Sequence, residues 1–260
     1  MEIYTTEGEN MKVQKRDYVN IAVTILLFIT FCVFTFLVKT VDVGIAGFSG
    51  VEVGFSTINQ RIFNAFRNET LEKVSDILGY LGLLVMLLFA VVGLIQLIKR
   101  KSIKKIDYSL MCLAGIYVLT IVTYILFELI KINYRPILVD GELQASYPSS
   151  HTMLAIVAFI SGGIQIGYLT DCEWIKPVAF VCGTVFALAE TLTRLLAGVH
   201  WFTDIIGSVI IGATIVMVYV TALELIETNS IPSGEVVVPE DFNLKIDNGT
   251  ETDEEVKSKN

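Results

Sequence analysis

Apolar residues in this chain gather in long blocks. Five runs contain no acidic or basic residue, and each is close to the ~20 residues that an α-helix needs to cross a bilayer core. These runs cover residues 19–38, 77–98, 108–127, 152–170 and 205–223. A sixth run begins at Pro177 and meets Glu190 and Arg194 before it ends, so its last turns should face a polar interior. The pattern predicts an all-α integral membrane protein, a bundle of six transmembrane helices.

Composition supports this prediction and sets the boundaries of the membrane domain. Hydrophobic residues make up 53% of the 260 residues and charged residues only 18%, below the share typical of soluble domains. We expect a cytoplasmic segment at 1–18, a membrane domain at 19–226 and an acidic, disordered cytoplasmic tail at 227–260. The acidity and the lack of a basic stripe argue against a nucleic acid partner.

Loop charge orients the predicted helices. The densest basic cluster lies between the second and third runs, at residues 99–105, and should be cytoplasmic. Both termini are then cytoplasmic, and the loops at 39–76, 128–151 and 195–204 face outside. One of these outer stretches, residues 51–77, is amphipathic at mostly helical spacing. It predicts a helix on the outer membrane interface, or equally a loop helix packed on the bundle.

Residues that could bind or react with a ligand gather at the predicted outer face. Both histidines, His151 and His200, lie there, together with Arg135, Arg194 and a pair of serines before His151. A protein that only fills the membrane has no reason to gather these groups at one face. They therefore indicate a site for an anion, since guanidinium groups and helix starts both bind phosphate.

Each group also has a simpler interpretation. His200 and Asp204 are four apart, so on a helix the carboxylate could hold one ring nitrogen and leave the other as a nucleophile. Alternatively, Asp204 is a helix cap beside an interfacial histidine. Ser149 could be a plain N-cap. The two arginines could anchor helix ends among lipid headgroups, and Arg194 could pair with Glu190 one turn earlier.

The order of the pieces points to one family. Arg135-Pro136 is followed by Pro148-Ser149-Ser150-His151, and then by Thr193-Arg194 with a histidine and an aspartate at fixed spacing. This resembles the three-part signature of the type 2 phosphatidic acid phosphatase family, written KxxxxxxRP, PSGH and SRxxxxxHxxxD. The motifs extend from residue 128 to 204, and the six-helix layout extends the resemblance to about residue 225.

Three positions depart from that signature. Thr193 stands in place of the serine, and Ser150 in place of the glycine, where its backbone N–H remains available. Glu128 stands in place of the lysine, with Lys131 three residues on. A carboxylate beside a phosphate site repels the substrate, so we expect Glu128 either to turn away or to pair with a cation. Lys131, Arg135 and Arg194 are the candidate partners, and pairing is favoured.

The resemblance implies a metal-independent phosphatase that forms a phosphohistidine, with no cofactor. By resemblance, His200 attacks phosphorus, Asp204 orients it, and His151 protonates the leaving oxygen and then activates water. The implied phosphate-binding residues are Lys131, Arg135, Ser149, Ser150 and Arg194.

The expected substrates are lipid phosphates or diphosphates such as undecaprenyl diphosphate, phosphatidylglycerol phosphate or phosphatidic acid. Their hydrolysis is expected at the extracytoplasmic face of the cell membrane. The alternatives are a non-catalytic phosphate-lipid binder or transporter on the same fold, and a phosphotransferase with an acceptor other than water.

Overall fold

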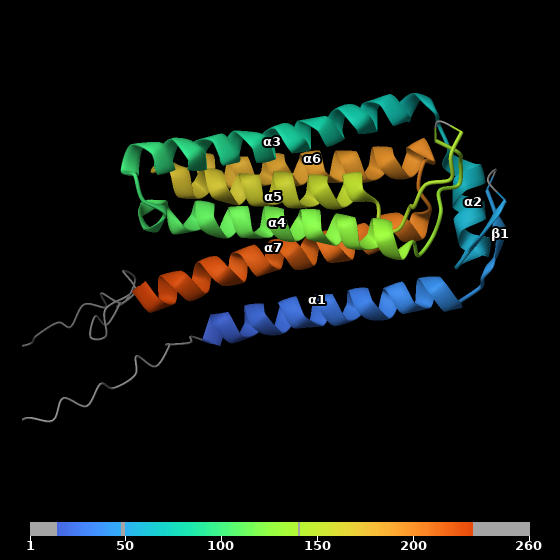
Figure 1. Ribbon diagram of the computed structural model, residues 1–260, viewed down its shortest axis with the longest axis horizontal. Helices are drawn as coiled ribbons and strands as arrows, with labels where there is room; N and C mark the ends of the chain where they lie inside the picture. The colour runs from blue at the N-terminus through green and yellow to red at the C-terminus, as the bar shows by residue number, and fades with distance from the viewer. Residues whose placement is uncertain (1–14, 48–49, 140, 231–260) are drawn as a thin grey trace, which may run out of the picture. The chain divides into compact units, whose positions relative to one another are not determined.

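The computed structural model describes residues 15–47, 50–139 and 141–230. Residues 1–14 of the expected cytoplasmic segment 1–18 and residues 231–260 of the expected tail 227–260 lie outside these residues. The described elements are α1 (Lys15–Thr40), β1 (Gly44–Ala46), β2 (Val51–Val53), α2 (Ser56–Phe66), α3 (Thr70–Arg100), the 3-10 helix η1 (Ile103–Lys105), α4 (Tyr108–Ile130), α5 (Ser150–Leu169), α6 (Ile175–Ala197) and α7 (Phe202–Ser230) (Figure 1).

Six of the described helices are long and apolar enough to cross a membrane, namely α1, α3, α4, α5, α6 and α7. The predicted six-helix membrane bundle is confirmed, and the chain is an integral membrane protein. Several helices are longer than their apolar runs, because polar end residues continue the backbone hydrogen bonding. α3 begins at Thr70 rather than at 77, and α7 extends to Ser230, past the predicted domain end at 226.

α5 lies at the centre of the bundle, in contact with α3, α4 and α6. Small residues bring α5 and α6 close together. A Cβ at Gly163 would come within 2.6 Å of the Ala179 carbonyl oxygen, and one at Gly183 within 2.2 Å of the Phe159 carbonyl oxygen. Such close backbone approach is the usual way that helices pack in a membrane, where lipid removes the hydrophobic drive. This packing fixes the ends of α5 and α6, which carry site residues.

α1 and α7 pack against the loop before α5 and against each other. The Tyr147 hydroxyl hydrogen bonds to Thr35 of α1 at 2.8 Å. The Tyr147 ring fills the space left by Gly207 of α7, where a Cβ would lie 2.5 Å away. Near the other end of the two helices, Arg16 and Glu224 form an ion pair at 3.2 Å.

The predicted amphipathic segment 51–77 is divided into three pieces. Residues 51–53 form the second strand of an antiparallel hairpin, in which Gly44 pairs with Val53. α2 covers 56–66, and α3 takes over from Thr70. The left-handed backbone of Phe55 (φ 51°) starts α2, and the extended ψ of Arg67 ends it, so the amphipathic helix is present but shorter than predicted.

α2 packs on the start of α7, in agreement with the second of the two interpretations above. The Asn59 side chain donates to Thr203 Oγ1 at 2.9 Å and accepts from the Thr203 backbone N–H at 3.2 Å. Phe63 packs against the fully buried Trp201, with ring centroids 5.7 Å apart. The β-hairpin and α2 lie at the end of the bundle opposite the α3–α4 connection (Figure 1).

Candidate active site

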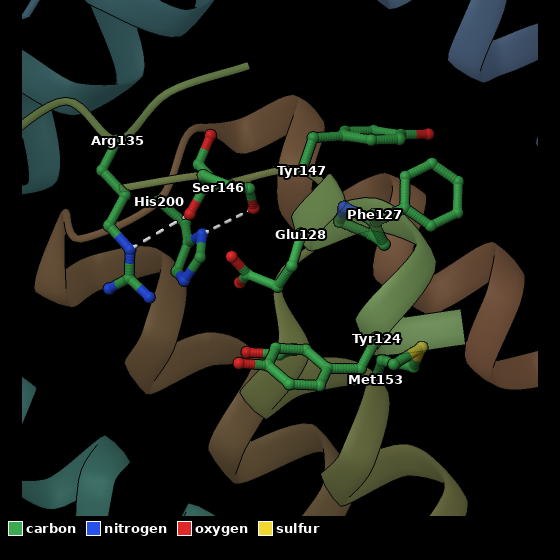
Figure 2. A pocket seen from close by; sticks show the side chains of 11 residues that line it. Tyr124, Phe127, Glu128, Arg135, Ser146, Tyr147, Met153 and His200 are labelled. Carbon is green, nitrogen blue, oxygen red and sulfur yellow. Dashed lines mark hydrogen bonds between the residues drawn. The ribbon is translucent and has the colours of Figure 1, made fainter. Parts of the chain in front are cut away.

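The loop between α4 and α5 is folded back on itself and carries the first motif. The Arg135 N–H donates to the Gln144 carbonyl at 3.0 Å, and the Ser146 N–H donates to the Asn133 carbonyl at 2.9 Å. The Arg135 Nε also donates to the Ala145 carbonyl at 3.4 Å. These bonds hold the Arg135 side chain and the Ser146 carbonyl beside the same cavity (Figure 2).

His200 lies in the turn before α7, not on the helix itself, because α7 begins at Phe202. Its Nδ1 is 2.9 Å from the Ser146 carbonyl oxygen and 3.7 Å from Asp204 Oδ2. A carbonyl oxygen only accepts, so Nδ1 carries the proton and Nε2 holds a lone pair. The Ser146 carbonyl is thus the near partner of the ring, a backbone group that sequence motifs do not reveal.

The Asp204 carboxylate is held by several groups at once. Its Oδ2 accepts from the Trp201 backbone N–H at 2.9 Å, and its Oδ1 accepts from Asn133 Nδ2 at 3.4 Å. Asp204 is fully buried. The sequence left open whether Asp204 caps the helix or holds His200. In the structure Asp204 caps the start of α7 and also lies beside His200.

The second ring nitrogen of His200 is available for chemistry. Nε2 is buried and has no hydrogen-bond partner among the described residues, and His200 lines the cavity that Arg135 also lines. Burial lowers the pKa of His200 well below its ordinary value, and the charges of Arg135 and Arg194 lower it further. The imidazole is therefore neutral at physiological pH, the form in which Nε2 can attack an electrophile.

Arg194 is fixed by α3 rather than by Glu190. Its Nη1 forms an ion pair with Asp76 Oδ1 at 2.9 Å and contacts Ser75 Oγ at 3.4 Å. Glu190 instead accepts from Ser75 Oγ at 3.3 Å. Sequence reasoning missed both α3 residues, because they lie far from the motifs along the chain.

His151 is held by that same arginine. Arg194 Nη2 lies 3.3 Å from His151 Nδ1, and because arginine only donates, Nδ1 of His151 is the acceptor. In its neutral form this ring carries its proton on Nε2, the opposite tautomer to His200. A Cβ at Gly79 would lie 2.6 Å from His151 Cδ2, so the ring packs directly on the α3 backbone.

Two cavities meet at the start of α5. The small polar one, about 10 Å³, is lined by residues that include Arg135, His200 and Glu128 (Figure 2). The other, about 680 Å³, is lined mainly by apolar side chains of α3, α4 and α5, with His151 at its edge. Tyr124, Ser150 and Met153 line both. A ligand with a polar head and an apolar tail could occupy the two together.

Comparison with known proteins finds one family that part of the chain resembles. Residues 126–226 match the family model described as PAP2 superfamily, a stretch that runs from the end of α4 through most of α7 and carries most of these site residues. Over these residues the chain is similar to the PAP2 superfamily. No curated protein matches it.

A solved structure shares the PAP2 fold. It is a transmembrane PAP2-type phosphatidylglycerolphosphate phosphatase from Bacillus subtilis, with a TM-score of 0.55 and 20% sequence identity. The alignment covers 82% of this chain and 98% of that one. The likeness extends beyond residues 126–226 and so includes helices that the family model does not match.

The remaining residues predicted from the PAP2 motifs take different places. Ser150 lines both cavities, whereas Ser149 is fully buried with its hydroxyl on Thr152 Oγ1 at 3.3 Å. Lys131 ends α4 in a left-handed conformation (φ 50°), is exposed, and lines neither cavity. Glu128 does line the polar cavity. The charge of Glu128 interacts with that of Arg135, and the expected brace to a neighbouring cation stays a prediction.

Proposed function

We propose that this protein hydrolyses lipid-linked phosphate monoesters or diphosphates through a phosphohistidine on His200. The observation that carries the proposal is the buried, unpartnered His200 Nε2, which faces a cavity shared with Arg135. The similarity of residues 126–226 to the PAP2 superfamily supports a phosphatase activity. The adjoining apolar cavity of about 680 Å³ supports a lipid substrate, because it offers an acyl or prenyl chain a place beside the phosphate.

The first half-reaction transfers the phosphoryl group to the enzyme. His200 Nε2 attacks phosphorus, an N–P bond forms, and the P–O bond to the lipid breaks. His151, in its doubly protonated imidazolium form, gives its Nε2 proton to the departing oxygen and becomes the neutral ring. Arg135 and Arg194 bind the phosphoryl oxygens and stabilise their charge in the transition state. The Ser146 carbonyl and Asp204 stabilise the proton that stays on Nδ1, and with it the positive charge of the phosphorylated ring.

The second half-reaction releases inorganic phosphate. His151 accepts a proton from water, the water oxygen attacks phosphorus, and the N–P bond breaks to restore neutral His200. In this assignment Ser150 donates its backbone N–H to the phosphoryl oxygens. Ser149 stabilises the first turn of α5 through its contact with Thr152. Lys131, exposed at the end of α4, attracts the anionic headgroup. No step uses a metal ion.

The test is a phosphate-release assay on purified protein with a panel of lipid phosphates. The panel contains phosphatidic acid, phosphatidylglycerol phosphate and undecaprenyl diphosphate, each with and without a chelator. We expect release from at least one lipid, unchanged by chelation. Binding without release would favour the non-catalytic alternative, transfer to an acceptor other than water would favour a phosphotransferase, and chelator-sensitive release would contradict the mechanism.

We also propose that the site faces the extracytoplasmic side of the cell membrane. The basic cluster at the end of α3 and in η1 supports this, because it lies at the other end of the bundle from the α4–α5 loop (Figure 1). In a variant without the native cysteines, a cysteine at Gly141 should react with a membrane-impermeant thiol reagent in intact cells. A cysteine at Ser102 should not, and the reverse result would overturn the orientation.

A further inference from the structure

The apolar cavity beside His151 is lined along two helices, α3 and α4. Its α3 wall is a stripe at helical spacing from Gly79 to Ala90, and its α4 wall extends from Tyr124 back to Tyr117. The two helices run in opposite directions (Figure 1). Gly79 and Tyr124 therefore mark the end of the cavity near His151, and Ala90 and Tyr117 mark its far end.

The far end of the cavity lies where α3 and α4 come together. Ala90 is the last α3 residue that lines the cavity. Beyond it, Gln96 Nε2 donates to Asp107 Oδ2 at 2.6 Å, and the Asp107 backbone N–H donates to Gln96 Oε1 at 3.1 Å. Figure 1 shows the two helices close together at their connection and farther apart at the opposite end. The cavity is thus a wedge that is widest beside the proposed catalytic residues.

This wedge has a buried floor and an open side. Tyr117, Thr120 and Met153 at its floor are buried, whereas Leu83 and Leu87 at its α3 rim are about half exposed. The rim belongs to a helix that crosses the membrane, so a lipid chain can enter from the side without passing through water. Because the wide end adjoins the proposed phosphate site, the chain that fits here is the substrate's own.

We propose that the apolar cavity binds one hydrocarbon chain of the lipid phosphate, and that Ala90 sets the length of chain it holds. This inference rests on the proposed function and names the chain of its substrate. Gly79 and Ala90 are eleven positions apart on α3, which corresponds to about 16 Å at roughly 1.5 Å per residue. That depth is about half of the ~30 Å hydrocarbon core of a bilayer, the reach of an acyl chain in one leaflet. The remainder of a longer polyprenyl chain would stay outside.

Ala90 limits the length because of its small side chain. Its methyl group leaves the far end of the wedge free for the last carbons of a long chain. A larger side chain at this position would compete with those carbons, in the way that overpacking destabilises a filled core. A short chain ends nearer His151 and would be affected much less.

Two alkyl phosphates that differ only in chain length test the proposal. Octyl phosphate and hexadecyl phosphate are assayed at equal surface concentration in the same detergent micelles. Each variant is compared with the wild-type protein on each substrate, so that partition into the micelle cancels. Ala90→Trp should lower kcat/KM for hexadecyl phosphate by about tenfold more than for octyl phosphate, within the range that overpacking costs.

Two further substitutions on α3 calibrate this result. Leu83 lines the cavity one turn from Gly79, where both chains pass, so Leu83→Trp should lower both rates by similar factors. Leu88→Trp is the matched control, because Leu88 is an exposed leucine of the same helix that lines neither cavity. It should leave both rates unchanged.

Photo-crosslinking locates the chain without a substitution in the cavity. The probe is hexadecyl phosphate with a diazirine at the end of the chain, bound to His200→Ala protein, which should turn it over far more slowly. Label should appear in residues 86–90 and 117–121, and excess unmodified hexadecyl phosphate should suppress it. The same group at the end of octyl phosphate should label residues nearer His151.

The outcomes separate this inference from the proposed function. Label spread over the lipid-facing surface, or equal losses for both substrates in a folded Ala90→Trp protein, would overturn the inference. The cavity would then hold ordinary membrane lipid, and release of phosphate from both substrates would leave the phosphatase intact. Where thermal unfolding shows that Ala90→Trp does not fold, the position of the label decides. A wild-type protein that releases phosphate from neither substrate nor any lipid of the panel overturns both.

Discussion

The two histidines of the site differ in what holds them. His200 is almost fully buried, and its Nδ1 is fixed by a backbone carbonyl, so its lone pair is on Nε2. His151 is half-buried and lines the apolar cavity, and its Nδ1 accepts from a charged side chain, that of Arg194. A rigid neutral ring suits a nucleophile, and a ring held by an arginine that we propose binds the phosphoryl group suits proton exchange with a ligand.

The strongest test of this contrast removes each ring in turn. We expect His200→Ala to lower turnover by about 10⁴- to 10⁶-fold, the scale for loss of a covalent nucleophile. His151→Ala should lower it by about 10²- to 10⁴-fold, the scale for general acid–base catalysis. Only His151→Ala should still become phosphorylated, from a substrate with a good leaving group.

The label distinguishes the two roles. Acid-labile, base-stable phosphate should be trapped on the wild-type protein and be absent from His200→Ala. Thermal unfolding of both variants serves as the control for folding. Label that persists without His200 would show that another residue is the nucleophile. The difference between the two rings would then not reflect a nucleophile and a proton-transfer group.

Asp204→Asn tests which partner fixes the His200 ring. In a serine protease triad, the corresponding change costs about 10⁴-fold because the histidine adopts the wrong tautomer. Here the Ser146 carbonyl holds Nδ1–H at 2.9 Å, against 3.7 Å for Asp204. The ring keeps its Ser146 contact but loses the nearby charge, and the amide can accept only one of the two hydrogen bonds that Asp204 accepts from Trp201 and Asn133. We therefore expect kcat to fall by about 100-fold, the upper end for one charge-assisted hydrogen bond. A fall of 10⁴-fold would make Asp204 the group that sets the tautomer.

Arg194, and His151 that it contacts, are held in place by Asp76 of α3. Asp76→Asn removes the charge that holds Arg194 Nη1 at 2.9 Å, and should lower kcat by about tenfold, the lower end for such a contact. Asp107→Asn is the matched control, because it weakens another arginine–aspartate pair, with Arg100 at 2.6 Å, near the basic cluster. Equal losses in both variants would indicate general destabilisation rather than a role at Arg194.

How much of this site the sequence could predict depends on the kind of contact. The six helices follow from apolar runs, since bilayer thickness imposes their length. The proposed catalytic side chains, His151, His200 and Asp204, follow from motifs that resemble those of a known family. The Ser146 carbonyl could not be predicted, since any residue type offers one. The Asp76–Arg194 pair could not either, because its members are 118 positions apart and their contact depends on how α3 packs on α6.

The smallest expected effect comes from the packing of His151 on α3. A Cβ at Gly79 would meet His151 Cδ2 at 2.6 Å, so Gly79→Ala must push the ring by several tenths of an ångström. His200 is untouched, so with a substrate whose good leaving group needs no proton from His151, phosphorylation should proceed nearly as in the wild-type protein. Hydrolysis of the phosphohistidine needs His151 to be correctly placed against water, so this step should slow by about three- to tenfold, well below the ~10²-fold cost of a 1 Å misplacement.

Gly93→Ala on the same helix is the control, because a Cβ there meets nothing within 4 Å. It should leave both steps unchanged and stabilise the helix by up to about 1 kcal/mol, the difference in helix propensity. Rapid-quench measurements separate the two half-reactions. A larger steady-state level of phosphoenzyme in Gly79→Ala than in Gly93→Ala would confirm that α3 positions the proton-transfer ring. Slower phosphorylation with unchanged hydrolysis would instead mean that the Gly79 contact affects His200. The separate roles proposed for the two histidines would then be contradicted.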